Sequence, residues 1–187
     1  MRIPRVLVAV AVLLAAAMPS YAPAQVESTP IPSPNKPNFS SQQFLIGTWT
    51  CSTKSARRPA AYVTTVTYKP DPNGWYIDET SVTKPMKWFA TQSPLTAYDK
   101  ITYDSTTHRW VDVLYDNQGG YGLSFSSGWN GNKLVWHDVS FAPTSDIKSQ
   151  TDTTITKLSN TKVTAESSFT EAKTGRVVAV NTVCTKH

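Results

Sequence analysis

The sequence predicts an all-β domain: an antiparallel up-and-down barrel of about ten strands, closed by a disulfide between its first and last strands. From Thr48 onward, runs of five to ten residues rich in Thr, Val, Tyr and Trp alternate with turn signals, and no helix-length pattern interrupts them. Several of the turns contain the Gly and Asn residues that tight hairpins require. Cys51 and Cys184, the two cysteines of the chain, lie in the first and last of these runs.

Residues 1–24 have the layout of a secretory signal peptide. Two arginines precede an apolar run from Val6 to Met18, and Ala22-Pro23-Ala24 forms an A-x-A cleavage site. The run has thirteen residues, whereas a membrane-spanning helix needs roughly 20. We therefore expect cleavage after Ala24, no membrane anchor, and a periplasmic or secreted protein.

Residues 25–39 are predicted to be a disordered linker. They contain Pro30, Pro32, Pro34 and Pro37, which favour an extended chain and are excluded from a sheet interior. The remaining residues, 40–187, have the right number for one domain with a sizeable core.

The charge of the chain indicates no nucleic-acid partner. Loss of Arg2 and Arg5 with the signal peptide lowers the net charge from +5 to about +3. The basic residues are scattered, whereas a nucleic-acid-binding protein concentrates them on one face.

The expected strands follow one another in hairpin order. Asp71-Pro72-Asn73-Gly74 and Asn130-Gly131 are among the turns that tolerate a positive φ. Consecutive strands should therefore be antiparallel neighbours. Their ranges are 47–53, 61–69, 75–83, 96–103, 109–116, 121–127, 133–141, 150–158, 161–170 and 175–185.

The cysteines favour a closed barrel over an open sheet. An open sheet would expose two edges to pairing with other chains, and closure removes both. In an exported protein two thiols are more often bonded than free, and a disulfide needs α-carbons within about 7 Å. A Cys51–Cys184 bond would place the first and last strands side by side. Two buried, unpaired thiols are the alternative.

The residues before the first strand are expected to close one end of the barrel. Residues 40–45 can form one helical turn with a serine cap, which leaves the apolar residues 44–46 to cover the opening. Gly47 then allows close approach of the backbone, and Trp49 is expected to plug the base.

This stretch resembles the first strand of the calycins, the group that includes lipocalins and fatty-acid-binding proteins. Gly47-Thr48-Trp49 matches their Gly-x-Trp motif. Leu45-Ile46-Gly47-Thr48-Trp49 and Gly128-Trp129-Asn130-Gly131 are also similar to motifs of uncharacterised bacterial lipocalin-like domains. The resemblance covers most of residues 40–187. It implies the barrel fold, but such barrels host carriers, inhibitors and a few enzymes.

Mixed strand faces point to a cavity that binds a small, partly apolar ligand. Alternate positions combine aromatic or aliphatic side chains with acids, whereas a solid barrel should have an apolar inner set. A loop at 84–89 carries three large apolar side chains, which we expect to form a lid over the open end. The predicted ligand-binding residues are Met86, Trp88, Phe89, Trp110, Trp136 and Glu79. Alternatively, the aromatic residues fill the core and the loop packs on the barrel wall.

The sequence predicts no metal site and no assembled catalytic site. The histidines are too widely spaced to form a typical metal site, and no serine lies in a Gly-x-Ser-x-Gly elbow. An enzyme that uses Glu79, Asp112 or His137 as its acid or base is the alternative to a binding protein. A third possibility is a filled barrel that acts through its surface.

A haem cofactor is not expected. Nitrobindins are calycin-like barrels that hold haem through one histidine late in the chain. In this sequence Thr50-Cys51-Ser52 follows Trp49 without their glycine repeat, and the one histidine after His137 is the terminal His187.

Overall fold

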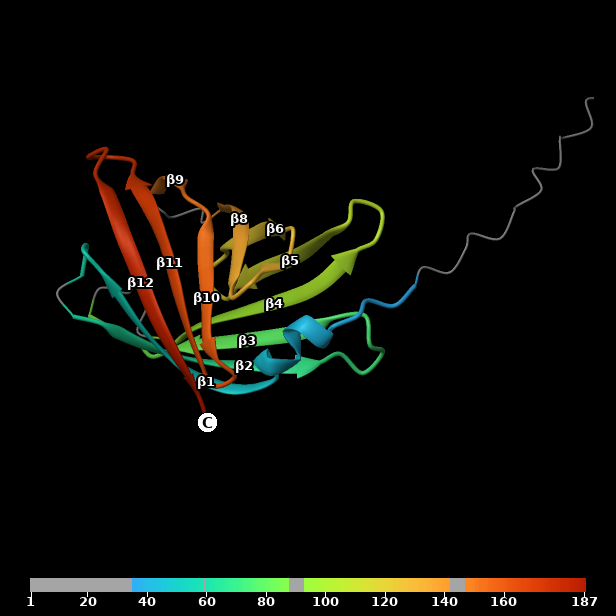
Figure 1. The fold of residues 1–187 in the computed structure, drawn as a ribbon. Helices are drawn as coiled ribbons and strands as arrows, with labels where there is room; N and C mark the ends of the chain where they lie inside the picture. The colour runs from blue at the N-terminus through green and yellow to red at the C-terminus, as the bar shows by residue number, and fades with distance from the viewer. Residues whose placement is uncertain (1–34, 59, 88–92, 142–146) are drawn as a thin grey trace, which may run out of the picture. The chain divides into compact units, whose positions relative to one another are not determined.

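The computed structural model describes residues 35–58, 60–87, 93–141 and 147–187. The chain divides into two units, 1–33 and 34–187, and all described elements belong to the second. They are a 3₁₀ helix and twelve strands (Figure 1): η1 (Ser40–Leu45), β1 (Gly47–Ser55), β2 (Tyr62–Pro70), β3 (Ile77–Thr83), β4 (Leu95–Asp104), β5 (Arg109–Asp116), β6 (Tyr121–Ser126), β7 (Trp129–Asn130), β8 (Lys133–Phe141), β9 (Ile147–Gln150), β10 (Thr153–Ser159), β11 (Lys162–Glu171) and β12 (Val177–Lys186).

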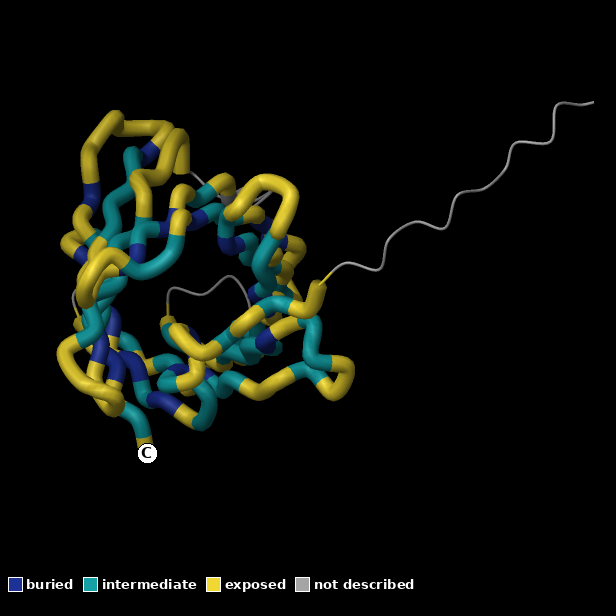
Figure 2. The backbone as a smooth tube through the Cα atoms, turned by 45° about the vertical axis from the view of Figure 1, so that its right-hand side comes forward, coloured by how far each residue is buried: buried dark blue, intermediate teal, exposed yellow. Residues whose placement is uncertain are grey.

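Ten of these strands form a closed antiparallel barrel, which confirms the predicted fold class. Each strand pairs with its neighbours in the chain, β12 pairs with β1, and β8 pairs with β10. The backbone accordingly forms a ring in Figure 2. No long connection is needed, because every pairing joins strands that are close in the sequence or are the first and last.

Two short strands were not predicted. β7 extends the hairpin to β8, and β9 pairs with the far end of β11. The predicted strand 150–158 corresponds to β10, which begins at Thr153; Gln150 instead ends β9, and Thr151 and Asp152 lie between the two strands. At the break, the Thr151 hydroxyl and amide both donate to the Ser168 carbonyl oxygen, at 3.1 and 2.8 Å, while Asp152 pairs with His137.

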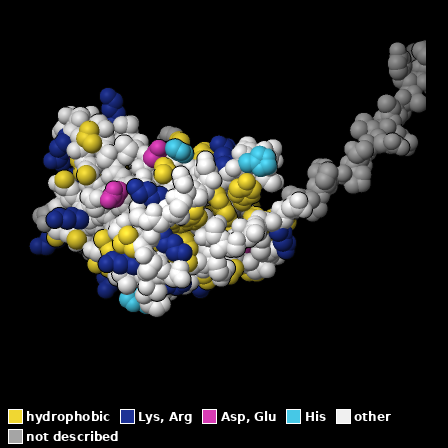
Figure 3. Space-filling view, in the orientation of Figure 1, with side chains coloured by type: hydrophobic (Ala, Val, Ile, Leu, Met, Phe, Trp, Pro, Cys, Tyr) yellow, Lys and Arg dark blue, Asp and Glu magenta, His cyan; other side chains and the backbone are white. Residues whose placement is uncertain are grey.

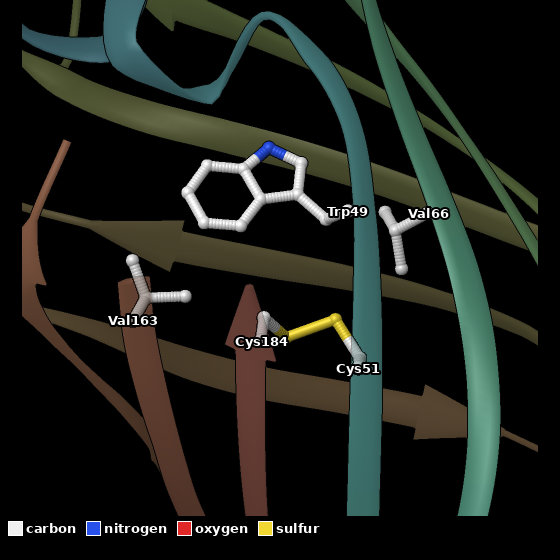
Figure 4. Packing of buried hydrophobic residues seen from close by; sticks show 5 residues of the cluster. All are labelled: Trp49, Cys51, Val66, Val163 and Cys184. Carbon is white, nitrogen blue, oxygen red and sulfur yellow. A yellow bond between two sulfur atoms is a disulfide. The ribbon is translucent and has the colours of Figure 1, made fainter. Parts of the chain in front are cut away.

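The disulfide lies where the first and last strands meet. Cys51 and Cys184 are opposite one another in the β1–β12 ladder, with α-carbons 4.0 Å apart, and their sulfur atoms are bonded. This confirms the predicted link between the strands. The bond packs with Trp49, Val66 and Val163 in one of the two core clusters of the barrel (Figure 4).

Trp49 fastens η1 to the barrel. Its ring is 1% exposed, and its Nε1 donates a 2.7 Å hydrogen bond to the carbonyl oxygen of Leu45, the last residue of η1. The expected serine cap is wrong: Ser40 is the first helical residue, and its amide donates to the Asn38 side chain.

The chain approaches η1 through residues 35–39, the described end of the predicted linker. Lys36 donates a hydrogen bond to the Asn73 carbonyl oxygen, and the Phe39 ring lies 5.8 Å from that of Trp110. Phe39 thereby joins the edge of the second core cluster, whose buried members are Ile77, Ile101, Trp110, Leu134 and Trp136.

Candidate functional site

The barrel contains a cavity of about 430 Å³. Inward-facing residues of β1, β2, β3, β11 and β12 line most of it, and we call it the apolar chamber. Its apolar wall includes the disulfide and the side chains of Trp49, Val66, Val163, Ile155 and Leu95.

A second cavity of about 280 Å³ adjoins the first, and we call it the acidic chamber. It lies against β4, β5, β6 and β8, and it shares the lining residues Leu45, Tyr68, Glu79 and Ile155 with the apolar chamber. Four carboxyl side chains border it: Glu79, Asp99, Asp112 and Asp138.

Strand alternation brings these four acids to the same interior. Glu79 follows the buried Ile77 by two residues, and Asp99 precedes the buried Ile101 by two, so each acid shares the inward face of its strand. Asp112 is related to Trp110 in the same way.

Strand register then sets which acids are neighbours. Glu79 is opposite Tyr68 on β2 and Asp99 on β4. Asp112 is opposite Ser124 on β6, and Ser124 is opposite Asp138 on β8. The acids thus form two adjacent cross-strand rows, with Ser124 between Asp112 and Asp138.

Burial makes three of these acids hard to ionise. The pKa of Glu79 is raised to about 8, first by burial and then by the charge of Asp112, while a hydrogen bond from Tyr68 acts in the opposite direction. Burial and the charge of Glu79 raise the pKa of Asp99 to about 8 as well. The pKa of Asp112 lies well above its usual value, through burial and then the charges of Asp99 and Asp138.

Asp138 accepts two side-chain hydrogen bonds. Thr153 Oγ1 donates to its Oδ2 at 2.5 Å, and Gln150 Nε2 donates to the same oxygen at 3.1 Å. By contrast, Asp112 Oδ1 is buried without a hydrogen-bond partner.

Gln42 of η1 adds an unpaired donor to the acidic chamber. Its side chain is 1% exposed and lines the chamber. Its Oε1 accepts a hydrogen bond from Trp129 Nε1 at 3.2 Å, and because an indole N–H can only donate, this contact fixes the orientation of the amide. The Nε2 group is then left buried with no acceptor.

No basic side chain neutralises the acidic chamber within the described ranges. Ion pairs among these residues link Arg57 and Arg176 to Glu171, and Lys100 to Asp78, and none of these residues lines the acidic chamber. His137 Nδ1 lies 2.8 Å from Asp152 Oδ2, and Arg58 lines the neighbouring apolar chamber. In the same ranges, no group of three His, Cys, Asp or Glu side chains is arranged to hold a metal ion.

Two of the six predicted ligand-binding residues line the cavities. Glu79 lines both chambers and Trp136 lines the acidic one. Trp110 is buried in the core next to Phe39 and Tyr103, and it borders neither chamber. Met86 is half-buried and also borders neither. Trp88 and Phe89 lie outside the described residues.

His137, considered as an acid or base of the cavity, lies on the outer surface. It is exposed, and its Nδ1 is 2.8 Å from Asp152 Oδ2. Its neighbours Trp136 and Asp138 both line the acidic chamber, so alternation along β8 turns His137 outward. Asp112, considered for the same role, does face the chamber.

Sequence reasoning did not single out Asp99, Asp138 or Gln42. A signal for the two acids was present, because each lies two residues from a buried apolar side chain, Ile101 and Trp136, on its strand. No pattern could have identified Gln42, which depends on how η1 packs against Trp129.

The surface outside the cavity shows no concentrated charge in the view of Figure 3, where Lys and Arg side chains are scattered. Among the described residues, no helix is long and apolar enough to cross a membrane.

Comparison with known proteins identifies no family. No family model matches the chain, and no curated protein matches it. A solved structure described as EF1p2_mFAP2b bound to DFHBI aligns with 79% of this chain and 97% of its own, at 14% sequence identity and a TM-score of 0.38. That score is too low to support an argument, so the functional interpretation depends on the cavity alone.

Proposed function

We propose that this protein is a secreted or periplasmic barrel that binds a small, partly apolar molecule in its interior. The observation that carries the proposal is the apolar chamber of about 430 Å³ inside a closed barrel. Ligand pockets of proteins typically measure about 300–1,000 Å³ and combine apolar walls with a few polar groups. The chamber fits this description and disfavours a filled barrel that acts only through its surface.

The proposed location is supported by the disulfide, since such bonds persist in oxidising compartments. It also agrees with the signal peptide expected at residues 1–24.

The ligand is proposed to enter at the end opposite η1. Thr83 at the end of β3 and Leu95 at the start of β4 both line the apolar chamber, so the connection between them begins and ends at its rim. This connection contains Met86, Trp88 and Phe89, which we propose as the lid. Replacing Trp88 and Phe89 with alanine should weaken ligand binding and leave the melting temperature nearly unchanged.

Ligand titration tests the proposal directly. Binding should quench tryptophan emission, because Trp49 and Trp136 lie in the chamber walls. Fatty acids, aromatic amines, aromatic acids and haem form a suitable panel, together with native mass spectrometry of protein from its own host. If no probe saturates at micromolar concentration and no molecule is retained, the binding function is wrong.

A pair of substitutions checks that the ligand occupies the chamber. Ala165 lines the apolar chamber, whereas Ala179 is exposed on the neighbouring β12. Ala165→Phe should fill the chamber and abolish binding, and Ala179→Phe should leave binding intact. Equal binding by the two variants would place the ligand elsewhere.

Acid–base catalysis in the same cavity is a second candidate function. The pKa of Glu79 is raised to about 8, which suits a group that exchanges protons near neutral pH. Incubation of the protein with the bound molecule, followed by mass analysis, separates the two functions. Recovery of an unchanged molecule supports binding alone, and turnover that Glu79→Gln abolishes supports catalysis.

A further inference from the structure

Three of the four carboxyl groups of the acidic chamber have no cationic partner among the described residues. Glu79, Asp99 and Asp112 come from three consecutive strands, and none of them forms an ion pair within the described ranges. Buried carboxyl groups without a cationic partner are costly to ionise, so proteins generally pair them with a cation or keep them protonated. This chamber is therefore suited to a guest that brings a positive charge.

Two unpaired polar atoms indicate independently that the guest is polar. Asp112 Oδ1 has no hydrogen-bond donor, and Gln42 Nε2 has no acceptor, although both residues line the chamber. A molecule that satisfies both must offer a donor to the acid and an acceptor to the amide. An ammonium group with a nearby hydroxyl or carbonyl oxygen has both features.

We propose that the acidic chamber receives the protonated amine of a small ligand, with Glu79, Asp99 and Asp112 as its acceptors and Gln42 as donor to a neighbouring oxygen of the same ligand. The inference rests on the proposed binding function and names the chemical class of its ligand. The apolar body of the ligand occupies the apolar chamber, because Glu79 and Tyr68 border both chambers.

Glu79 and Asp99 are protonated at the position that we propose for the ammonium group of the ligand. The pKa values of about 8 for Glu79 and Asp99 mean that both are mainly protonated at pH 7 without ligand. A bound ammonium stabilises the carboxylate forms, so binding releases protons. The groups facing this cluster are Tyr68 from β2, Asp112 from β5, Ser124 from β6, Asp138 from β8, Gln150 and Thr153 beside Asp138, and Gln42 from η1.

A matched series of probes tests the charge preference by calorimetry at pH 7. The probes are 2-amino-1-phenylethanol, its neutral counterpart 1-phenylethane-1,2-diol, and its anionic counterpart mandelate. Charge-assisted hydrogen bonds are about twice as strong as neutral ones, so we expect the amine to bind at least about 10-fold more tightly than the diol. Mandelate should bind most weakly. 2-Phenylethylamine lacks the hydroxyl group that Gln42 is proposed to bind, so it should bind more weakly than the amino alcohol. In the Gln42→Leu variant the two amines should bind with equal affinity.

Charge-matched variants locate the preference. Glu79→Gln should reduce the advantage of the amine over the diol several-fold. Glu166→Gln makes the same charge change at an exposed position on β11 and should leave that advantage unchanged. An equal effect of the two substitutions would overturn the assignment of the site.

Proton counting on the unmodified protein keeps the test valid if a variant fails to fold. Calorimetry at pH 7 in two buffers of different ionisation enthalpy should show a release of up to about one proton per amine bound. Equal affinity for amine and diol without proton release would overturn the proposed amine site but not the proposed binding function. Binding of Ca²⁺ without any preference for the amine would have the same consequence. Failure of every probe, with no retained molecule in native mass spectra, would overturn both.

Discussion

Glu79 and Asp99 lie directly opposite one another on β3 and β4, and both face the interior of the barrel. Like charges at opposite positions of a ladder destabilise a sheet. Burial and the charge of Glu79 raise the pKa of Asp99 to about 8, and burial and the charge of Asp112 raise that of Glu79 to about 8, so both acids are mainly protonated at neutral pH.

Stability should fall as the pH rises from 5 to 9. Glu79 and Asp99 titrate near pH 8 in the folded protein but near pH 4 when unfolded, so the native state binds more protons between these values. Stability is therefore greatest below the unfolded pKa and is lost as the pH rises through 8. The free energy of unfolding, measured in urea at several pH values, tests this dependence. Glu79→Gln should flatten the profile, and a profile unchanged by Glu79→Gln or rising towards pH 9 would contradict the buried pair.

Reduction of the disulfide should destabilise the barrel substantially. Cys51 and Cys184 are 133 residues apart, and a loop of that length corresponds to about 4–5 kcal/mol in the chain-entropy model, which is an upper estimate. Thermal unfolding with and without reductant, with thiol titration of the unfolded protein as a control, measures the effect. Equal melting temperatures would show that the bond contributes little.

Trp49→Ala should cost about 3–5 kcal/mol, because it removes a fully buried ring and the hydrogen bond that holds Leu45. Val177→Ala, at a position that is 67% exposed on β12, serves as the control and should change stability by less than about 0.5 kcal/mol. Chemical denaturation of both variants gives the comparison. If the Trp49 variant is as stable as the parent, the Trp49 ring does not stabilise the end of the barrel.

Gly47→Ala should be more damaging than Gly131→Ala. Both glycines have positive φ, but Gly47 has φ +126°, and a Cβ there would lie 2.8 Å from Lys186 Cε. Moving Lys186 would also disturb its hydrogen bond to the Phe44 carbonyl oxygen. Gly131 has φ +61° and open space around it, so its substitution should cost only about 1 kcal/mol. The denaturation midpoints of the two variants measure this difference. Equal midpoints would show that backbone strain alone determines the cost, and a lower midpoint for Gly47→Ala would show that crowding against Lys186 adds to it.

The fold could be predicted because its signals are local and repeated. Turn residues such as Asn130-Gly131 set the hairpins, and the positions of Cys51 and Cys184 indicated which strands close the ring. The break between β9 and β10 depends on contacts of Thr151 and Asp152 with distant residues, which no local pattern encodes.

The candidate site was only partly predictable. Glu79 and Trp136 were identified because aromatic side chains and acids alternate along their strands. Trp110 has the same pattern, yet its ring is covered by Phe39 from a segment expected to be a linker. Whether an inward-facing side chain borders a cavity or is packed over depends on three-dimensional neighbours, and alternation alone does not distinguish the two.

The bond between the first and last strands turns residues 51–184 into a covalent circle. Every hairpin connection of the barrel lies within that circle, including Gly131-Asn132 between β7 and β8. A single peptide-bond cut at any of these connections leaves one linked molecule, since the two fragments remain joined through Cys51 and Cys184. A protease can thus cut the backbone once at such a connection without separating the strands into independent chains.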